Sequence, residues 1–391
     1  RKFFLPYFAD HAYAFTGALR AVDIEAEVMP RPDAETVALG EQHSTGKECH
    51  AYSIIAGDFL KLARSERRGN EVFFFPGSKS TCVLAQYDKA LSFLAEDLGI
   101  AGLDVFGATG DALARLLTMK GLKYLWQGLV SIDLLVRASC AVRPYEARKG
   151  ETDEVHLANL RDIEAGLASG GIAPALKRCA ERLESVRSRR REKRRPVVGV
   201  AGDIYTRINP VANHDLFLKL EELGCEIRPS SFFIDEVDFD LDRGIRQKIV
   251  GRKFGASSVM AILYLRKEVE KIKIRRTLGK AGPLAKDPTY SDVVEFTSPY
   301  LGIDNNRFLF LNIAKMVAFA RDGADGVINA ICFNCMLGNV SAGIASKIRK
   351  DYDQIPIPTF TYTGSELASE RTRLEAFAFQ VHQYAKRKKS R

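Results

Sequence analysis

The chain has 391 residues, with 46% hydrophobic and 27% charged residues and a formal net charge of +9. This length predicts two or three domains with sizeable cores. Apolar runs break within about ten residues, well short of a bilayer-spanning helix, which excludes an integral membrane protein. Much of the positive charge lies at 187–195 and 386–391, and no nucleic-acid-binding motif accompanies it, so nucleic acid is not an expected partner.

The first half of the chain alternates between strand-like and helix-like segments. Strands are expected at 3–7, 26–30, 72–75 and 103–106, and helices at 12–22, 51–65 and 83–98. Residues 111–140 and 154–190 indicate further helices with few strand signals. Such alternation predicts a parallel sheet covered by helices on both faces.

The same order of elements returns near residue 197. Strands are expected at 197–201, 224–229, 326–330 and 358–362, with helices at 215–223, 241–278, 305–321, 339–350 and 370–384. The segment "ALRAVDIEAEVMP" at 18–30 matches "KLEELGCEIRPS" at 219–230, which indicates an internal repeat. We therefore predict an α/β protein with two related doubly wound, flavodoxin-like or Rossmann-like parallel-sheet domains and additional helical segments. The domains would span 1–150 and 196–391, with a helical basic linker at 151–195.

Seven cysteines and no secretory signal argue against a disulfide framework and favour the cytoplasm. Cys49 begins a predicted helix, Cys82 lies between a strand and a helix, and so do Cys332 and Cys335. Ligands of open α/β sheets gather at the carboxyl ends of strands, where helix N-termini stabilise thiolates. These cysteines are therefore expected to face one crevice.

An iron–sulfur cluster suits such a crevice, because its ligands are thiolates and its core is negatively charged. Lys47 and Lys79 add positive charge nearby, and Gly46, Gly77 and Gly338 permit close approach of the backbone. Zinc is a weaker alternative because the chain has no second Cys-x-x-Cys pair. A redox dithiol at 332–335 would leave the other two cysteines unexplained.

The remaining three cysteines are interpreted differently. Cys140 ends a predicted helix just before Arg143, and it is a candidate for a further ligand. Cys179 and Cys225 are expected to be buried thiols without a ligand role.

Several segments resemble the large 2-hydroxyacyl-CoA dehydratase activator (activase) family. They are "LPYFADHAYAFTGAL" at 5–19, "STGKECHAYSIIAGDFLKL" at 44–62, "FFFPGSKSTCVLAQY" at 73–87 and "VRPYE" at 142–146. The resemblance continues through "GVAGDIYTRINPVANHDLFLKLEELGCEI" at 199–227 and "ERTRLEAFAFQV" at 370–381, and so covers nearly the whole chain. It implies doubly wound domains with an iron–sulfur cluster at their junction, as in the related dehydratase subunits and double-cubane cluster proteins.

The resemblance also implies a chemistry and a set of partners. An ATP-dependent activase would pass a low-potential electron to the cluster for radical dehydration or reduction of an acyl-CoA. Cys49, Cys82 and one or both of Cys332 and Cys335 fall where ligands of a 4Fe-4S cluster are expected, and Cys140 would help to hold a double-cubane 8Fe-9S cluster. The chain lacks the family's ATPase part and a G-x-x-x-x-G-K-[ST] loop, so ATP would bind a partner or a missing segment. A homodimer is compatible with this assignment.

Polar residues near these segments supply further candidates. Lys47, His50, Gln86, Tyr87 and Asn334 could tune a cluster's potential, whereas Asp10, His11, Asp203, Tyr205 and Asn209 are expected on loops lining the crevice. Arg143 and Arg207 could contact CoA phosphates or an acidic partner. For each of these side chains, surface or packing contacts are the alternative. For the whole chain, the alternatives are a non-catalytic docking or scaffold region with a structural or lost cluster, and a CoA-ester enzyme without a redox metal.

Overall fold

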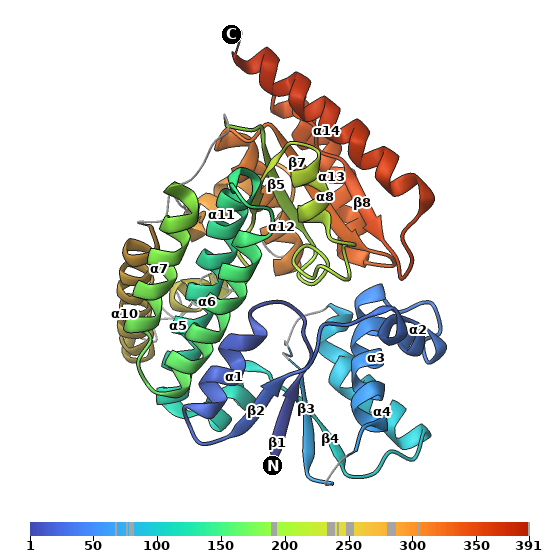
Figure 1. Ribbon diagram of the computed structural model, residues 1–391, viewed down its shortest axis with the longest axis vertical. Coiled ribbons are helices and arrows are strands. Elements are labelled where there is room, and N and C mark those ends of the chain that lie inside the picture. Colours follow the sequence, from blue (N-terminus) through green and yellow to red (C-terminus); the bar gives the residue numbers. More distant parts are fainter. Residues whose placement is uncertain are drawn as a thin grey trace.

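The computed structural model describes residues 1–66, 69–75, 77, 82–188, 194–232, 239–240, 242–247, 254–279, 287–302 and 305–389. It is an α/β protein, 61% helical, with two four-stranded all-parallel sheets flanked by helices (Figure 1). The predicted fold class is therefore confirmed. Lys79, most of the basic run at 187–195 and part of the helix expected at 241–278 lie outside the described residues.

The first sheet has the strand order β2-β1-β3-β4. Its strands are β1 (Lys2–Leu5), β2 (Glu25–Val28), β3 (Glu71–Phe75) and β4 (Leu103–Gly107). The helices around it are α1 (Ala12–Arg20), α2 (Ala34–Gln42), α3 (His50–Arg64) and α4 (Tyr87–Asp97), which follows the 3-10 turn η1 (Val83–Gln86). All of β3 is buried because helices cover both faces of this inner strand, which explains its continuous apolar run.

The second sheet repeats this arrangement with the order β6-β5-β7-β8. Its strands are β5 (Val197–Gly202), β6 (Glu226–Pro229), β7 (Gly326–Cys332) and β8 (Thr359–Tyr362). Its helices are α8 (Leu216–Glu222), α12 (Arg307–Arg321), α13 (Met336–Asp351) and α14 (Ala368–Lys389). Each sheet therefore has its topological switch point beside its first strand, and ligands of such sheets bind there, beyond the carboxyl ends of the strands.

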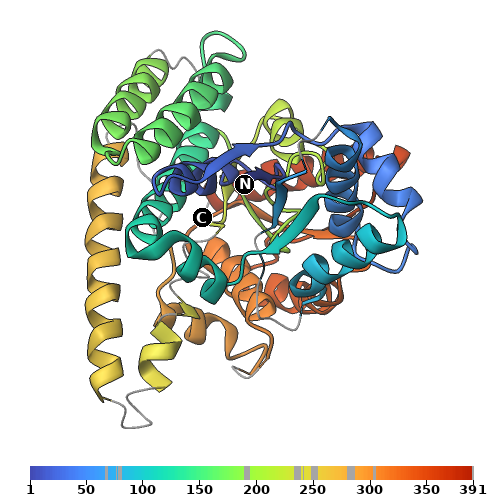
Figure 2. The same ribbon diagram turned by 90° about the horizontal axis from the view of Figure 1, so that it is seen from below.

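Further helices in the described part of the chain extend beside the two sheets. They are α5 (Gly110–Val142), α6 (Glu151–Ala168), α7 (Ala173–Ser188), α10 (Phe254–Leu278) and α11 (Tyr290–Thr297). Helix α6 packs on α1 and α5, α7 packs on α6, and α10 packs on α5 and α7. Most of the segment predicted as a linker is thus two helices packed against the first half, and α10 forms one outer side of the molecule (Figure 2). The domain boundaries at 150 and 195 stay predictions.

Helix α5 is the one described helix that is long and apolar enough to cross a membrane. Most of its apolar stretch, 83%, is buried inside the protein, as in a core helix. Thr118, with φ of 56°, breaks the helical geometry and divides α5 into two segments. The apolar character of α5 is therefore accounted for by its packing against α1, α6, α7 and α10.

Helix α2 begins at a capping box, and this cap gives a test of local stability. The Asp33 carboxylate accepts a hydrogen bond from Thr36 N at 2.8 Å and an ion pair from Lys61 Nζ at 2.6 Å. The hydrogen bond from Lys61, followed by that from Thr36 N, lowers the pKa of Asp33 to about 2. The carboxylate therefore stabilises the folded protein fully above the pKa that Asp33 has in the unfolded chain, and this stabilisation is lost as the pH falls through about 2. We expect Asp33→Ala to lower the free energy of unfolding by about 1 kcal/mol at pH 7 in urea titrations. Asp33→Asn keeps a capping oxygen and serves as the control; an equal loss in both variants would contradict the capping role.

Candidate functional site

Three of the predicted site cysteines occupy the same local position, the residue that caps a helix N-terminus. Cys49 is the N-cap residue of α3, Cys82 that of η1 and Cys335 that of α13, while Cys332 is the last residue of β7; the side chains of Cys49 and Cys82 make no capping hydrogen bond. The first amides of a helix have no partner within the helix and carry partial positive charge, so they stabilise a nearby thiolate. The backbone N–H of Gly338, for example, donates to Cys335 Sγ at 3.2 Å.

The structure brings these four cysteines together. Cys49, Cys82, Cys332 and Cys335 line one cavity of about 40 Å³. The wall is completed by residues that follow β5 and by the starts of α12 and α13, including Asp203, Tyr205, Phe308, Asn312 and Gly338. The cavity therefore lies between the two halves, at the carboxyl ends of strands from both sheets.

Contacts among the thiols and burial shift the pKa values of three of the cysteines. Cys332 interacts through its thiol with both Cys49 and Cys335, and the Tyr87 hydroxyl hydrogen-bonds to Cys49 Sγ. The hydrogen bond from Cys332, followed by that from Tyr87, lowers the pKa of Cys49 despite its burial. The pKa of Cys332 is raised, first by its bonds to Cys335 and Cys49, and burial raises that of Cys82 to about 12. Within the pair of Cys49 and Cys332, Cys49 is therefore the more acidic thiol.

Removing the Tyr87 hydroxyl should change the reactivity of Cys49. In Tyr87→Phe the thiolate of Cys49 loses a hydrogen-bond donor, so its pKa should rise and its alkylation by iodoacetamide at pH 7 should slow severalfold. Quantitative mass spectrometry of the Cys49 peptide measures this rate, and the Cys82 peptide in the same samples is the internal control. Unchanged alkylation of Cys49 would contradict the proposed contact.

Asp203 fixes the loop that carries two of the cysteines. Its Oδ1 accepts from Tyr205 N at 2.9 Å and Thr206 N at 2.7 Å, and its Oδ2 accepts from Cys332 N at 2.7 Å. Burial raises the pKa of Asp203, against the effect of these hydrogen bonds. The loop of the first half is tied to the same place, because Asn334 Nδ2 donates to Gly46 O at 2.9 Å.

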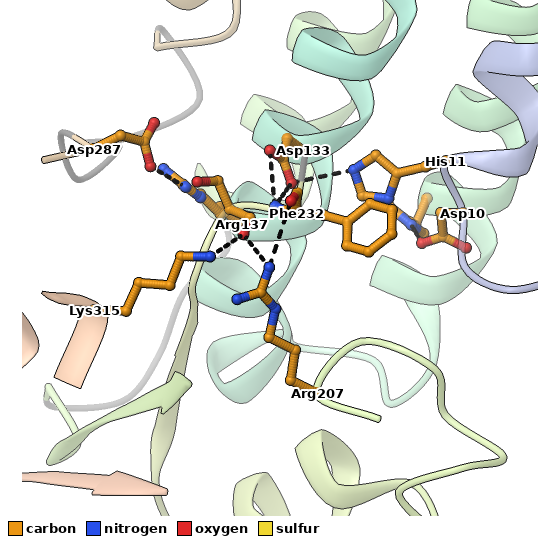
Figure 3. Close-up of polar contacts among 10 residues, drawn as sticks. Asp10, His11, Asp133, Arg137, Arg207, Phe232, Asp287 and Lys315 are labelled. Atoms are coloured by element: carbon orange, nitrogen blue, oxygen red, sulfur yellow. Dashed lines mark hydrogen bonds and ion pairs between the residues drawn. The ribbon is translucent and has the colours of Figure 1, made fainter. Parts of the chain in front are cut away.

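A second set of buried contacts joins the halves (Figure 3). Asp133 on α5 accepts from Phe232 N at 3.0 Å and contacts His11 Nε2 at 3.1 Å. Arg207 and Lys315 both donate to the carbonyl oxygen of Ser231, at 2.9 and 3.4 Å. The loops after β1 and β6 are thereby held against α5, which fixes how the two sheets face each other.

A larger cavity of about 590 Å³ lies near the ends of β1, β2 and β6. Tyr7 donates to Asp10 Oδ1 at 2.5 Å, and His156 Nε2 contacts Asp10 Oδ2 at 2.7 Å. The sequence predicts Asp10 and His11 in the crevice of the cysteines, but the structure places them on the wall of this other cavity, and they are not among the residues that line the cysteine cavity. His156 was not foreseen, because nothing in its local sequence marks its contact with a residue 146 positions away.

The structure places Cys140 apart from the other candidate ligands. It is buried on the wall of the larger cavity, where burial raises its pKa to about 12 despite Arg143 beside it. Arg143 itself is paired with Asp153 and Glu221. Cys179 and Cys225 are buried in the core, as expected.

The other candidates divide between the cavity and the surface. Tyr87 touches Cys49, and Asn334 and His50 link the two halves, the latter through its backbone N–H to Phe333 O at 3.3 Å. Lys47 and Gln86 are exposed. Arg207 is 2% exposed and donates to backbone carbonyls, so it is not presented to a CoA phosphate.

Two kinds of metal group place different requirements on these donors. Within the described ranges, no group of three or more His, Cys, Asp or Glu side chains is arranged to hold a single metal ion. A zinc site would need all its ligands about 2.3 Å from one point. An iron–sulfur cluster places iron and sulfide between its thiolates, so its ligands stand farther apart. The four thiols match a cluster in donor type, but not in spacing, because Cys332 is in hydrogen-bond contact with both Cys49 and Cys335 around a cavity of about 40 Å³.

Comparison of the whole chain with known family models and with curated proteins finds no match to either.

Proposed function

We propose that the chain is an iron–sulfur redox protein of the 2-hydroxyacyl-CoA dehydratase and activase superfamily. The observation that carries this proposal is the convergence of Cys49, Cys82, Cys332 and Cys335 from both halves on one buried cavity. The sequence resemblance described above supplies the family, and cysteines at the ends of parallel strands supply the all-sulfur donor set that a cluster requires. A cluster bound there supplies one-electron transfer at low potential.

The residues around the cavity have separable tasks in this proposal. The four cysteines hold the group, and Gly338 N and the Tyr87 hydroxyl donate hydrogen bonds to sulfur. Such donors raise a cluster's potential, whereas burial away from water lowers it, so these contacts set the working range. Asp203 orients the Cys332–Cys335 loop through Cys332 N.

The rim of the cavity supports docking of a separate electron donor. Val83, Phe333, Met336 and Val340 are exposed, and each is next to a site cysteine or within the first two turns of α13. Exposed apolar side chains gathered at one place mark interaction surfaces. We assign this rim to an ATP-dependent activase that carries its own nucleotide site.

The larger cavity is the proposed place for an organic substrate such as an acyl-CoA. Its volume of about 590 Å³ is in the range of small-molecule sites, and it combines an apolar wall of Val136, Leu160 and Phe217 with the polar pair of Asp10 and His156.

All seven cysteines are free thiols, which supports a reducing compartment, the cytoplasm.

Anaerobic reconstitution with iron and sulfide tests the proposal. The expected result is several iron and sulfide per chain, with broad absorption near 400 nm that bleaches with dithionite and an EPR signal in the reduced state. Colourless protein that retains no iron would overturn it and favour a docking or scaffold region. Turnover of a CoA ester by iron-free protein would instead favour a non-redox enzyme.

A further inference from the structure

Helix α10 has two apolar faces, one of which is used inside the protein. Ile274 and Leu278 are buried in the core shared with α5. Trp126 Nε1 on α5 donates to Lys267 O at 3.3 Å, and Gln127 Nε2 donates to Glu270 Oε2 at 2.9 Å. These contacts hold α10 as a folded helix against the rest of the chain.

The other face of α10 carries an exposed apolar stripe. Ile262, Leu265, Val269 and Ile272 are 55%, 63%, 49% and 46% exposed. Their spacing of three, four and three residues is that of the a and d positions of a heptad, which aligns them along one side of the helix. This side faces away from the buried Ile274, and α10 lies along the edge of the molecule (Figure 2).

We propose that this stripe pairs with the same stripe of a second copy of the chain, as a parallel two-stranded coiled coil. With Ile262 and Val269 at a, and Leu265 and Ile272 at d, both a positions are β-branched and one of the two d positions is leucine, which is close to the pattern that favours two strands in parallel. A twofold axis along the paired helices lets each copy present the same surface to the other.

The charges beside the stripe select the parallel orientation. In that orientation Glu268 at position g lies beside Lys273 at position e of the second copy, and the twofold axis makes this contact twice. Within its own helix Glu268 pairs with Lys267 at 3.2 Å and with Lys271 at 2.8 Å, and Lys273 pairs with Glu270 at 3.4 Å; the side chain of Glu268 is 25% exposed and that of Lys273 is 66% exposed. Antiparallel pairing of the same layers would place Arg266 against Lys273, which is repulsive.

The length of the stripe sets the expected strength of the dimer. Two heptads bury less than the roughly 800 Å² per partner of a standard interface. Because α10 is already held by α5 and α7, little ordering opposes its association. We therefore expect a dimer that dissociates in the micromolar range, independent of any cluster at the cysteine cavity.

Sedimentation velocity over loading concentrations from about 1 to 100 µM tests the association. The wild-type chain should shift from monomer to dimer, and the double variant L265E/V269E should stay monomeric. Phe379→Glu on α14, where the replaced side chain is 64% exposed, is the matched control and should dimerise like wild type. Unchanged thermal melts show that the exposed substitutions leave the fold intact. A wild-type chain that stays monomeric, or a dimer that survives L265E/V269E, would overturn the proposal.

A charge exchange and a cysteine cross-link test the orientation. Glu268→Lys and Lys273→Glu should each weaken dimerisation by about tenfold, and the double exchange should restore it. Val269→Cys should form an intermolecular disulfide under mild oxidation beyond any seen in wild type, because a positions face each other in a parallel pair. No restoration together with no cross-link would exclude the parallel arrangement.

Discussion

Cys332→Ala is expected to leave the reconstituted protein with little or no iron. Cys332 is the central thiol of the cavity, since it interacts with both Cys49 and Cys335. Removing a direct ligand should weaken binding of the group by more than the 10- to 100-fold typical of changes to residues that only support ligands. The backbone N–H that Asp203 holds is unchanged by the substitution, so the loop should keep its conformation. Iron and sulfide analysis with absorption spectra measures the loss.

Cys225→Ala and Cys140→Ala are the matched controls for this substitution. Cys225 is a buried thiol in the core, and Cys140 lines the larger cavity. Both should bind as much iron as wild type, at a small cost in stability from the lost sulfur. Loss of iron in Cys140→Ala would show that the site extends beyond the four cysteines, and full iron content in Cys332→Ala would remove Cys332 from the ligands.

The alternating architecture could be predicted because buried strands and long helices leave clear patterns. Strand β3 is an uninterrupted apolar run, and the two halves repeat the same strand order. Helices α2 and α11 were not predicted: each is short, and their start depends on a capping box at Asp33 or Thr289 rather than on an apolar stripe. The break at Thr118 also left no signal, because the residues around it read as one continuous apolar helix.

The grouping of the cysteines could be predicted because it follows largely from the order and direction of the strands. Parallel strands end at the same edge of a sheet, so residues at the ends of β3 and β7 lie close together once these edges of the two sheets face each other. The placement of Cys140 could not be predicted, since it depends on which side of α5 faces the second half. The pairing of Asp10 with His156 joins elements that only tertiary packing brings together.

Gly202→Ala is expected to be the most damaging single substitution beside the site. Gly202 ends β5 with φ of +144°, and a Cβ there would lie 1.8 Å from the carbonyl oxygen of Ala330 on the adjacent strand β7. The clash is with a backbone atom, which cannot move to another rotamer as a side chain can, so β5 and β7 would have to separate. The Gly202 N–H bond to Asn312 Oδ1, at 2.7 Å, would be disturbed as well. We expect a loss of about 4 kcal/mol or more, at the extreme of single substitutions, seen in urea unfolding or as insoluble protein.

Gly343→Ala is the matched control, with the opposite sign. Gly343 lies on the exposed side of α13, and a Cβ there would meet no atom within 4 Å. Alanine favours the helix and should raise the free energy of unfolding by roughly 0.5–1 kcal/mol. The comparison separates steric conflict at the β5–β7 junction from a general effect of replacing glycine. A Gly202→Ala protein as stable as wild type would mean that β5 and β7 do not approach each other as closely as their register at Gly202 and Ala330 requires.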